Sequence, residues 1–178
     1  FLTREAIMDM PVSNGLVPLD TGKDILKIAA IERTYLSGKT FVGFIRGIGF
    51  KQGAIATSCT SDSWDILAVG ASEADMAHGV NRIRELNGGI VVCAGGKILA
   101  EIPLPIGGIF SPEPMETIAQ KLRGVQQAAT SLGCIPSNIH NIHNTLTFLT
   151  SEAIPFLRIC EHGLIDMAQN RLVELIVD

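Results

Sequence analysis

The apolar residues of this chain fall in short runs that glycine and proline interrupt, and this pattern constrains the fold most strongly. The most apolar stretch, residues 90–110, contains Lys97, Glu101, two prolines and two glycine pairs. A membrane-spanning helix needs about 20 nearly continuous apolar residues. The stretch therefore predicts two strands joined at Gly95-Gly96, and a membrane protein is a poor fit.

Three segments carry helical signals. Residues 71–86 place apolar side chains on one face after Ser72, a suitable N-cap. Residues 111–133 begin with serine, proline and glutamate, which suit a helix N-terminus. A short helix is also expected over residues 20–38, where isoleucine, leucine and alanine recur at helical spacing.

Short β-branched or aromatic runs predict the strands. We expect residues 40–50 and 53–58 to form a strand pair, residues 66–70 to continue the sheet, and the tail to form two strands around Gly163. Asn14-Gly15 predicts a tight turn within an extended arm.

This order of elements favours an α+β fold with mixed or antiparallel sheets and two to three packed helices. The expected organisation is an N-terminal extended hairpin arm over residues 1–22 and a single compact domain over residues 23–178. One right-handed crossover, from strand 66–70 through the next helix to the strand at 90–93, remains open.

Composition excludes several classes of protein. Of the 178 residues, 47% are hydrophobic and only 18% are charged, which is typical of a folded domain with a well-covered interior. The formal net charge of −4 makes nucleic acid an unlikely partner.

The four cysteines are too far apart for CxxC pairs, so we expect reduced, mostly buried thiols. Without a visible signal peptide the expected location is cytoplasmic, and a start at Phe1 suggests a piece of a longer protein.

Two motifs resemble known sites but also have simpler interpretations. Glycines 47, 49 and 53 are spaced like a loose dinucleotide fingerprint, yet a strand follows them where that motif needs a helix. Arg46 and Lys51 beside them could still hold an anion. His140 and His143, with His162 as a third ligand, could hold a metal, although a polar loop is the simpler interpretation because Pro136 precedes them.

Residues 59–65, CTSDSWD, surround the only tryptophan with hydroxyls and carboxylates. As a site, the loop would expose Trp64 beside Asp62 and Ser63, with Arg46 or Lys51 close enough to form a polar pocket. As a turn, it would pack Trp64 into the core while its carboxylates cap backbone N–H groups. The favoured interpretation is a turn with a buried or half-buried ring, and the five residues remain candidates for substrate binding.

Several segments resemble the C-terminal domain of bacterial adenine deaminases, which are members of the amidohydrolase superfamily. These segments are KDILKIAAIER (23–33), GFIRGIGFKQGAIATS (43–58), residues 65–111 and LTFLTSEAIPFLRICEHGLIDM (146–167). The resemblance implies hydrolysis of adenine to hypoxanthine and ammonia. It places that reaction in a preceding barrel domain with a divalent metal (Mn, Fe or Zn). It implies no cofactor and no catalytic residue in this chain.

The chain departs from this family at two places. Where the family typically has a His-Asp-Ser-His-Asn loop, residues 61–65 read SDSWD, and where it commonly has a histidine after Glu-Arg, Thr34 follows Arg33. Both changes remove imidazoles. Two hypotheses follow: a C-terminal portion that is inactive without its barrel partner and could form a homo-oligomer, or a stand-alone binding or oligomerisation module that kept the fold.

Overall fold

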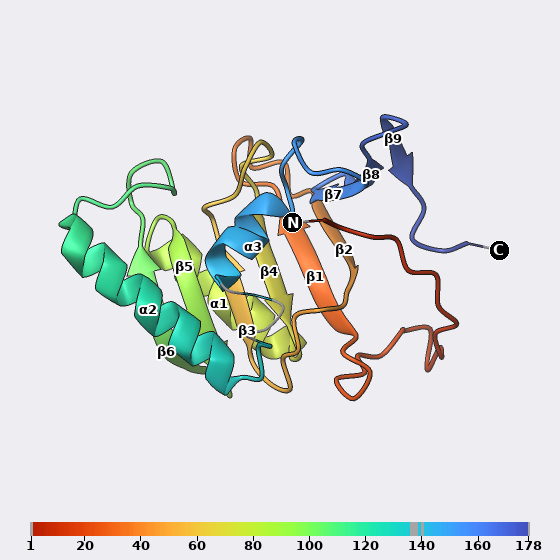
Figure 1. The fold of residues 1–178 in the computed structure, drawn as a ribbon, viewed down its shortest axis with the longest axis horizontal. Helices are drawn as coiled ribbons and strands as arrows, with labels where there is room; N and C mark the ends of the chain where they lie inside the picture. Colours follow the sequence, from red (N-terminus) through yellow and green to blue (C-terminus); the bar gives the residue numbers. More distant parts are fainter. Residues whose placement is uncertain (1, 136–138, 140, 178) are drawn as a thin grey trace.

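The computed structural model describes residues 2–135, 139 and 141–177 and shows an α+β domain built on two antiparallel sheets (Figure 1). The larger sheet has the strand order β2-β1-β4-β3-β5-β6, and the smaller has the order β7-β8-β9. The described strands are β1 (Leu26–Ile31), β2 (Thr40–Ile45), β3 (Ala54–Thr57), β4 (Ile66–Gly70), β5 (Gly89–Ala94), β6 (Lys97–Pro103), β7 (Leu157–Cys160), β8 (Gly163–Asp166) and β9 (Arg171–Val173). The predicted fold class is confirmed.

Within the described residues, three helices cover the two faces of the larger sheet. Helix α1 (Glu73–Glu85) packs on one face, whereas α2 (Met115–Ser131) and α3 (Ile142–Phe148) lie over the other (Figure 1). The small sheet lies beside β1 and β2. Helix α1 connects β4 to β5 across the intervening strand β3, as a crossover requires.

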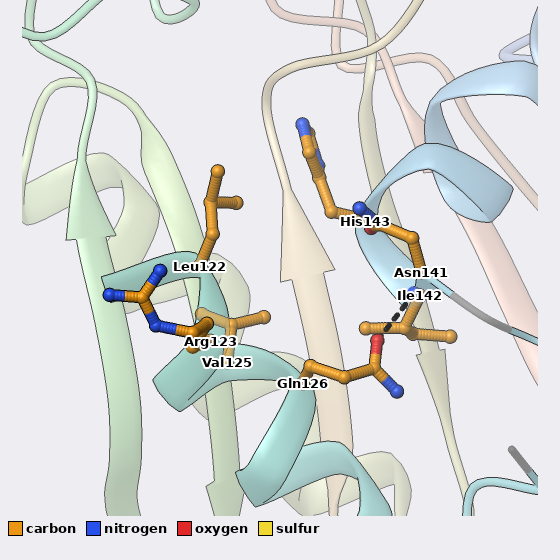
Figure 2. Close-up of a pocket in the computed structure, with 7 residues that line it drawn as sticks. All are labelled: Leu122, Arg123, Val125, Gln126, Asn141, Ile142 and His143. Carbon is orange, nitrogen blue, oxygen red and sulfur yellow. Dashed lines mark hydrogen bonds between the residues drawn. The ribbon is translucent and has the colours of Figure 1, made fainter. Parts of the chain in front are cut away.

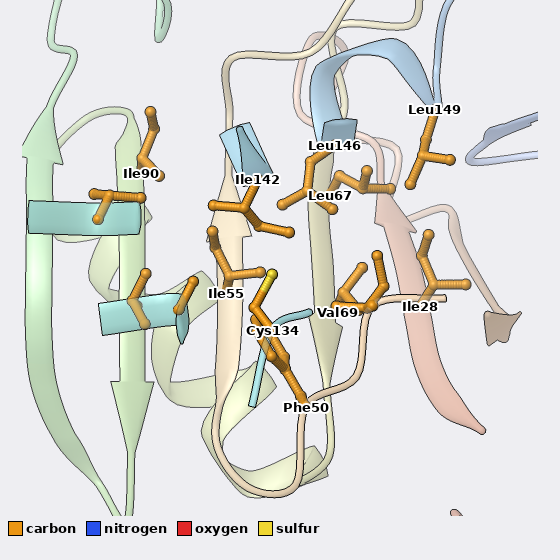
Figure 3. Packing of buried hydrophobic residues seen from close by; sticks show 14 of the residues in the cluster. Ile28, Phe50, Ile55, Leu67, Val69, Ile90, Cys134, Ile142, Leu146 and Leu149 are labelled. Carbon is orange, nitrogen blue, oxygen red and sulfur yellow. The ribbon is translucent and has the colours of Figure 1, made fainter. Parts of the chain in front are cut away.

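The two faces of the sheet differ in the size of their side chains. Facing α1 are mainly small residues, and Gly79 of that helix would bring an added Cβ to 3.3 Å from the Cβ of Ala56. The layer between the other face and helices α2 and α3 contains larger residues (Figure 3). These include Ile55 and Leu67 of the sheet, Phe50 of the β2–β3 connection and Ile142 of α3. Alternate residues of β3, β4 and β5 point to opposite faces, so both layers form from continuous apolar runs.

The helix expected over residues 20–38 is wrong, because Leu26–Ile31 form strand β1, which lies between β2 and β4 in the sheet. A strand buried on both faces has a nearly continuous apolar sequence, which helical spacing also fits. The expected pairing of residues 40–50 with 53–58 is also wrong. Strand β2 ends at Ile45 and pairs with β1, while β3 pairs with β4 and β5.

Other local predictions agree with the structure more closely. Ser72 caps α1 by accepting the Asp75 backbone N–H at 3.2 Å. Gly95 and Gly96 join β5 to β6 with positive φ angles of 57° and 72°. In the arm, Asn14-Gly15 forms the expected turn, and the division at residue 22 stays a prediction. Helix α2 begins at Met115, four residues after the predicted start.

The segment between β2 and β3 supports the structural interpretation of its glycines. Gly49 has φ +92°, and a Cβ there would lie 2.5 Å from Cγ1 of Ile135. The backbone N–H groups of Gly47 and Gly49 donate to the carboxylate of Asp24, at 2.6 and 2.7 Å. A carboxylate of the chain therefore occupies the donors that a bound anion would need.

Candidate functional site

Three loops meet at one end of the six-stranded sheet. Ile31 at the end of β1 pairs with both Thr40 of β2 and Ile66 of β4, and Gly89 at the start of β5 pairs with Pro103 at the end of β6. In Figure 1 these loops gather above the strands. We call this surface the loop edge, and it comprises residues 32–39, 58–65 and 104–114.

Glu32 fixes the first of these loops. Its carboxylate accepts the backbone N–H groups of Tyr35 and Ser37 and the hydroxyl of Ser37, the latter two at 2.7 and 2.9 Å. These hydrogen bonds, led by the one from Tyr35, lower the pKa of Glu32 to about 2. At the tip, Leu36 has φ +53°. The loop is therefore held in one conformation by a charged group.

Arg33 joins all three loops. Its Nη2 donates to the carbonyl oxygen of Gly107 at 3.0 Å and lies 3.4 Å from that of Ser58. Burial lowers the pKa of Arg33, while the charge of Asp65 raises it. A Cβ at Gly108 would lie 2.7 Å from Nη1 of Arg33, so a larger residue there would displace the guanidinium.

Asp65 is a buried acid at the end of the second loop. One carboxylate oxygen accepts the backbone N–H of Glu161 at 3.0 Å, and the hydroxyl of Thr60 donates to the Asp65 carbonyl at 2.8 Å. Burial, followed by the charge of Glu161, raises the pKa of Asp65 to about 6. The carboxyl of Asp65 thus titrates closer to neutrality than an ordinary aspartate.

Features expected of a turn and of a binding site both occur in CTSDSWD. Asp62 accepts the backbone N–H of Glu152 at 2.6 Å, so both aspartates cap backbone groups as a turn would require. Trp64, however, is 47% exposed and has φ +60°, so its ring is half-buried and is not packed into the core. The loop is a fixed turn that presents an aromatic ring at the surface.

The five candidate substrate-binding residues fall into two groups. The structure brings Asp62, Ser63 and Trp64 together in the loop edge. Arg46 follows the Ile45 end of β2, which pairs with Leu26, and the ammonium of Lys51 donates to the Thr21 carbonyl at 2.6 Å. That end of the sheet is opposite the loop edge, so these two cations do not complete a pocket with CTSDSWD.

Sequence reasoning missed the charged groups that hold the loop edge together. In the sequence, Glu32 and Arg33 drew notice only as the residues that precede Thr34. Nothing in the sequence around Glu161 relates it to Asp65, 96 positions earlier. The charged character of the SDSWD segment was the one usable signal.

A small cavity of about 200 Å³ lies between α2 and α3 (Figure 2). Gln126 accepts the backbone N–H of Ile142 at 2.8 Å across it. His143 lines the same cavity, and burial lowers the pKa of its imidazole. The expected polar loop is wrong at His143, which belongs to α3.

The histidine metal site, which the sequence left as the less favoured alternative, finds no support in the part of the chain that the structure describes. His140 lies outside the described residues, and His162 pairs with Glu161 at 3.1 Å in the turn between β7 and β8. Among the described residues, no group of three or more His, Cys, Asp or Glu side chains could hold a metal ion. The catalytic metal that the resemblance implies therefore does not fit these residues.

The four cysteines are free, as predicted, and three of them are buried. Burial is the main cause that raises the pKa of each thiol, Cys59 included. These thiols are therefore weak nucleophiles. No described helix is long and apolar enough to cross a membrane.

Comparison with known proteins identifies the family. Residues 1–171 match the family described as the adenine deaminase C-terminal domain. The chain is 42% identical over 173 residues to the adenine deaminase of Brucella melitensis biotype 1, covering 97% of this chain and 29% of the relative. For the adenine deaminase of Kosmotoga olearia the identity is 37% over 176 residues, covering 99% and 30% respectively. For that of Dehalococcoides mccartyi it is 37% over 172 residues, covering 97% and 30%.

These relatives are more than three times as long as the stretch that they share with this chain, which spans about 30% of each. The sequence similarity covers both the sheet and the loop edge. The chain therefore belongs to the adenine deaminase C-terminal domain family.

Proposed function

We propose that this domain is the C-terminal part of an enzyme that hydrolyses adenine to hypoxanthine and ammonia. The observation that carries the proposal is the match over residues 1–171 to the C-terminal domain of adenine deaminases, together with identities of 37–42% to proteins of that name. The reaction belongs to the whole protein, and this domain alone is inactive.

The proposed catalytic centre lies in a preceding barrel of the amidohydrolase type. Such a centre would use a bound divalent metal (Mn, Fe or Zn) to activate water for attack on the amino-bearing carbon of adenine. The described residues of this chain offer no set of ligands for that ion. The free cysteines are consistent with a reducing compartment, and we infer a cytoplasmic location.

The loop edge is the part of this domain that we expect to lie nearest to the reaction. Thr34 and the SDSWD segment, where imidazoles are missing by comparison with the family, lie on adjacent loops there. Trp64 is exposed and suited to stacking on a planar base. Asp62 and Ser63 beside it remain candidate substrate contacts, whereas Arg46 and Lys51 would need a separate role.

The alternative function is a stand-alone binding or oligomerisation module that kept the fold. The feature that favours it is that, by the resemblance described above, this chain lacks imidazoles at two positions of the same surface. Under this alternative, the gene would not encode a metal-binding barrel upstream of this domain.

Product analysis of the full-length protein tests the proposal. The metal-loaded protein should convert adenine to equal amounts of hypoxanthine and ammonia, separated by liquid chromatography and by an ammonia assay. Replacing the metal ligands of the upstream domain should abolish both products. A correctly folded, metal-loaded protein that leaves adenine unchanged would support the module instead.

A further inference from the structure

We propose that the loop edge is a preformed docking surface for the portion of the enzyme that precedes this domain. The inference rests on the proposed function, since it requires that this preceding portion exists. Its evidence is separate: exposed apolar side chains on three loops, each held in place by a buried or half-buried charged residue. The exposed residues are Tyr35, Leu36, Trp64, Ile106 and Phe110.

The first loop shows the arrangement most clearly. Tyr35 and Leu36 are 86% and 84% exposed, yet the carboxylate of Glu32 holds the backbone on either side of them. Leu36 adopts φ +53°, a conformation that leucine rarely takes. An unconstrained loop tip would relax such strain, so the structure keeps two large apolar side chains in a defined place at the surface.

The second loop repeats the arrangement around Trp64. The ring is half exposed at φ +60°, and Asp62 before it has φ +43°. The carboxylates of Asp62 and Asp65 attach this loop to the backbone N–H groups of Glu152 and Glu161. Strained backbone again coincides with an exposed aromatic side chain.

The third loop is attached to the other two by a cation. Arg33 donates to the carbonyl oxygen of Gly107, between Ile106 and Phe110. The backbone N–H groups of Ile109 and Phe110 both donate to the Ile106 carbonyl oxygen, at 3.2 and 3.0 Å, which closes a tight turn. Two more apolar side chains are thus exposed on an ordered loop beside the first two.

Single exposed apolar residues are ordinary, but five on three braced and adjoining loops need a partner. Loops that are already ordered lose little conformational entropy when they bind, so the charged residues that hold these loops in place favour docking. The preceding portion of the enzyme is the occupant we infer. Most of the length of each adenine deaminase relative lies outside the stretch matched here, and that portion must be joined to this domain.

Cysteine labelling of the full-length protein tests the inference. Leu36→Cys and Tyr35→Cys place a thiol on the loop edge, and Leu99→Cys on β6 is the control, because Leu99 is exposed near the opposite end of the sheet. Each modified peptide is quantified by mass spectrometry after iodoacetamide treatment, in native protein and in urea. Relative to its rate in urea, labelling at 35 and 36 should be at least about tenfold slower than at 99.

Equal labelling of all three thiols in the native protein would overturn the proposed docking surface. Protection that disappears when the protein is diluted to its monomer would assign the surface to a second copy, and would also overturn it. Adenine deamination is measured on the same samples. Active protein with unprotected thiols refutes only the docking surface, whereas inactive protein with protected thiols refutes only the proposed function.

Discussion

Both carboxylate oxygens of Glu32 accept hydrogen bonds from the loop that follows it, and this arrangement requires the ionised form. We predict that Glu32→Gln speeds amide hydrogen exchange at Tyr35 and Ser37, because a neutral amide is a weaker acceptor and has only one acceptor oxygen. Hydrogen exchange with mass spectrometry or NMR checks this. Glu174→Gln, an exposed position, is the control, and equal exchange in both variants would show that Glu32 does not hold the loop.

The same carboxylate gives the fold a dependence on acidic pH. Its pKa is lowered to about 2 from an ordinary value of 4.5, so its stabilisation is complete above the unfolded value and is lost as the pH falls through that range. Glu32→Gln should therefore lose part of the acid sensitivity of the parent domain.

Asp65 changes the pH dependence of stability in the opposite direction to Glu32, because burial raises the pKa of Asp65 to about 6. An acid whose folded-state pKa is raised stabilises the fold while protonated, and that contribution is lost as the pH rises from about 4 to about 6. We predict that Asp65→Asn gains stability relative to the parent as the pH rises through this window. Thermal unfolding at a series of pH values checks it, and a constant difference between the two proteins would refute it.

Substitutions of Trp64 and of Phe50 should differ sharply in their effect on stability. Phe50 is fully buried beneath α2 and α3, whereas Trp64 is half exposed on a loop. Phe50→Ala should lower the free energy of unfolding by about 3–5 kcal/mol, and Trp64→Ala by well under that. Denaturant unfolding measures both, and a similar loss for Trp64→Ala would mean that its ring is buried.

The packing of α1 on the sheet depends on small side chains. Ala56 of β3 is fully buried against Gly79 of α1, so no space exists there for a larger residue. Ala56→Leu should destabilise the domain by about 1–3 kcal/mol or more through overpacking. Ala77→Leu adds the same atoms to an exposed position of α1 and should change little. Equal effects of the two substitutions would contradict this account of the layer.

Sequence periodicity predicted the amphipathic helix α1 and the glycine-joined β5–β6 hairpin, because one face or one turn carried a clear signal. It failed at β1, where burial on both faces removes the alternation that marks a strand. It also failed for the loop edge as a site. Arg33, Asp65 and Glu161 come from three distant segments, and only the packing of the two sheets and their loops brings them together.

The two ends of the large sheet are chemically different. At one end, Asp24 accepts the glycine N–H groups of the β2–β3 connection and closes that turn internally. At the other end, Glu32, Arg33 and Asp65 hold loops whose apolar side chains remain exposed. A domain with one closed end and one preformed exposed end is suited to face a larger neighbour.

We propose that the reaction of the full-length adenine deaminase takes place outside this domain. Ammonia release from adenine by the purified 178-residue chain supplied with Mn²⁺, beside the full-length protein under the same conditions, tests this proposal. We expect release by the full-length protein and none above background by the isolated chain. Turnover by the isolated chain that persists through repeated purification and scales with its concentration would show that this domain has a catalytic centre of its own.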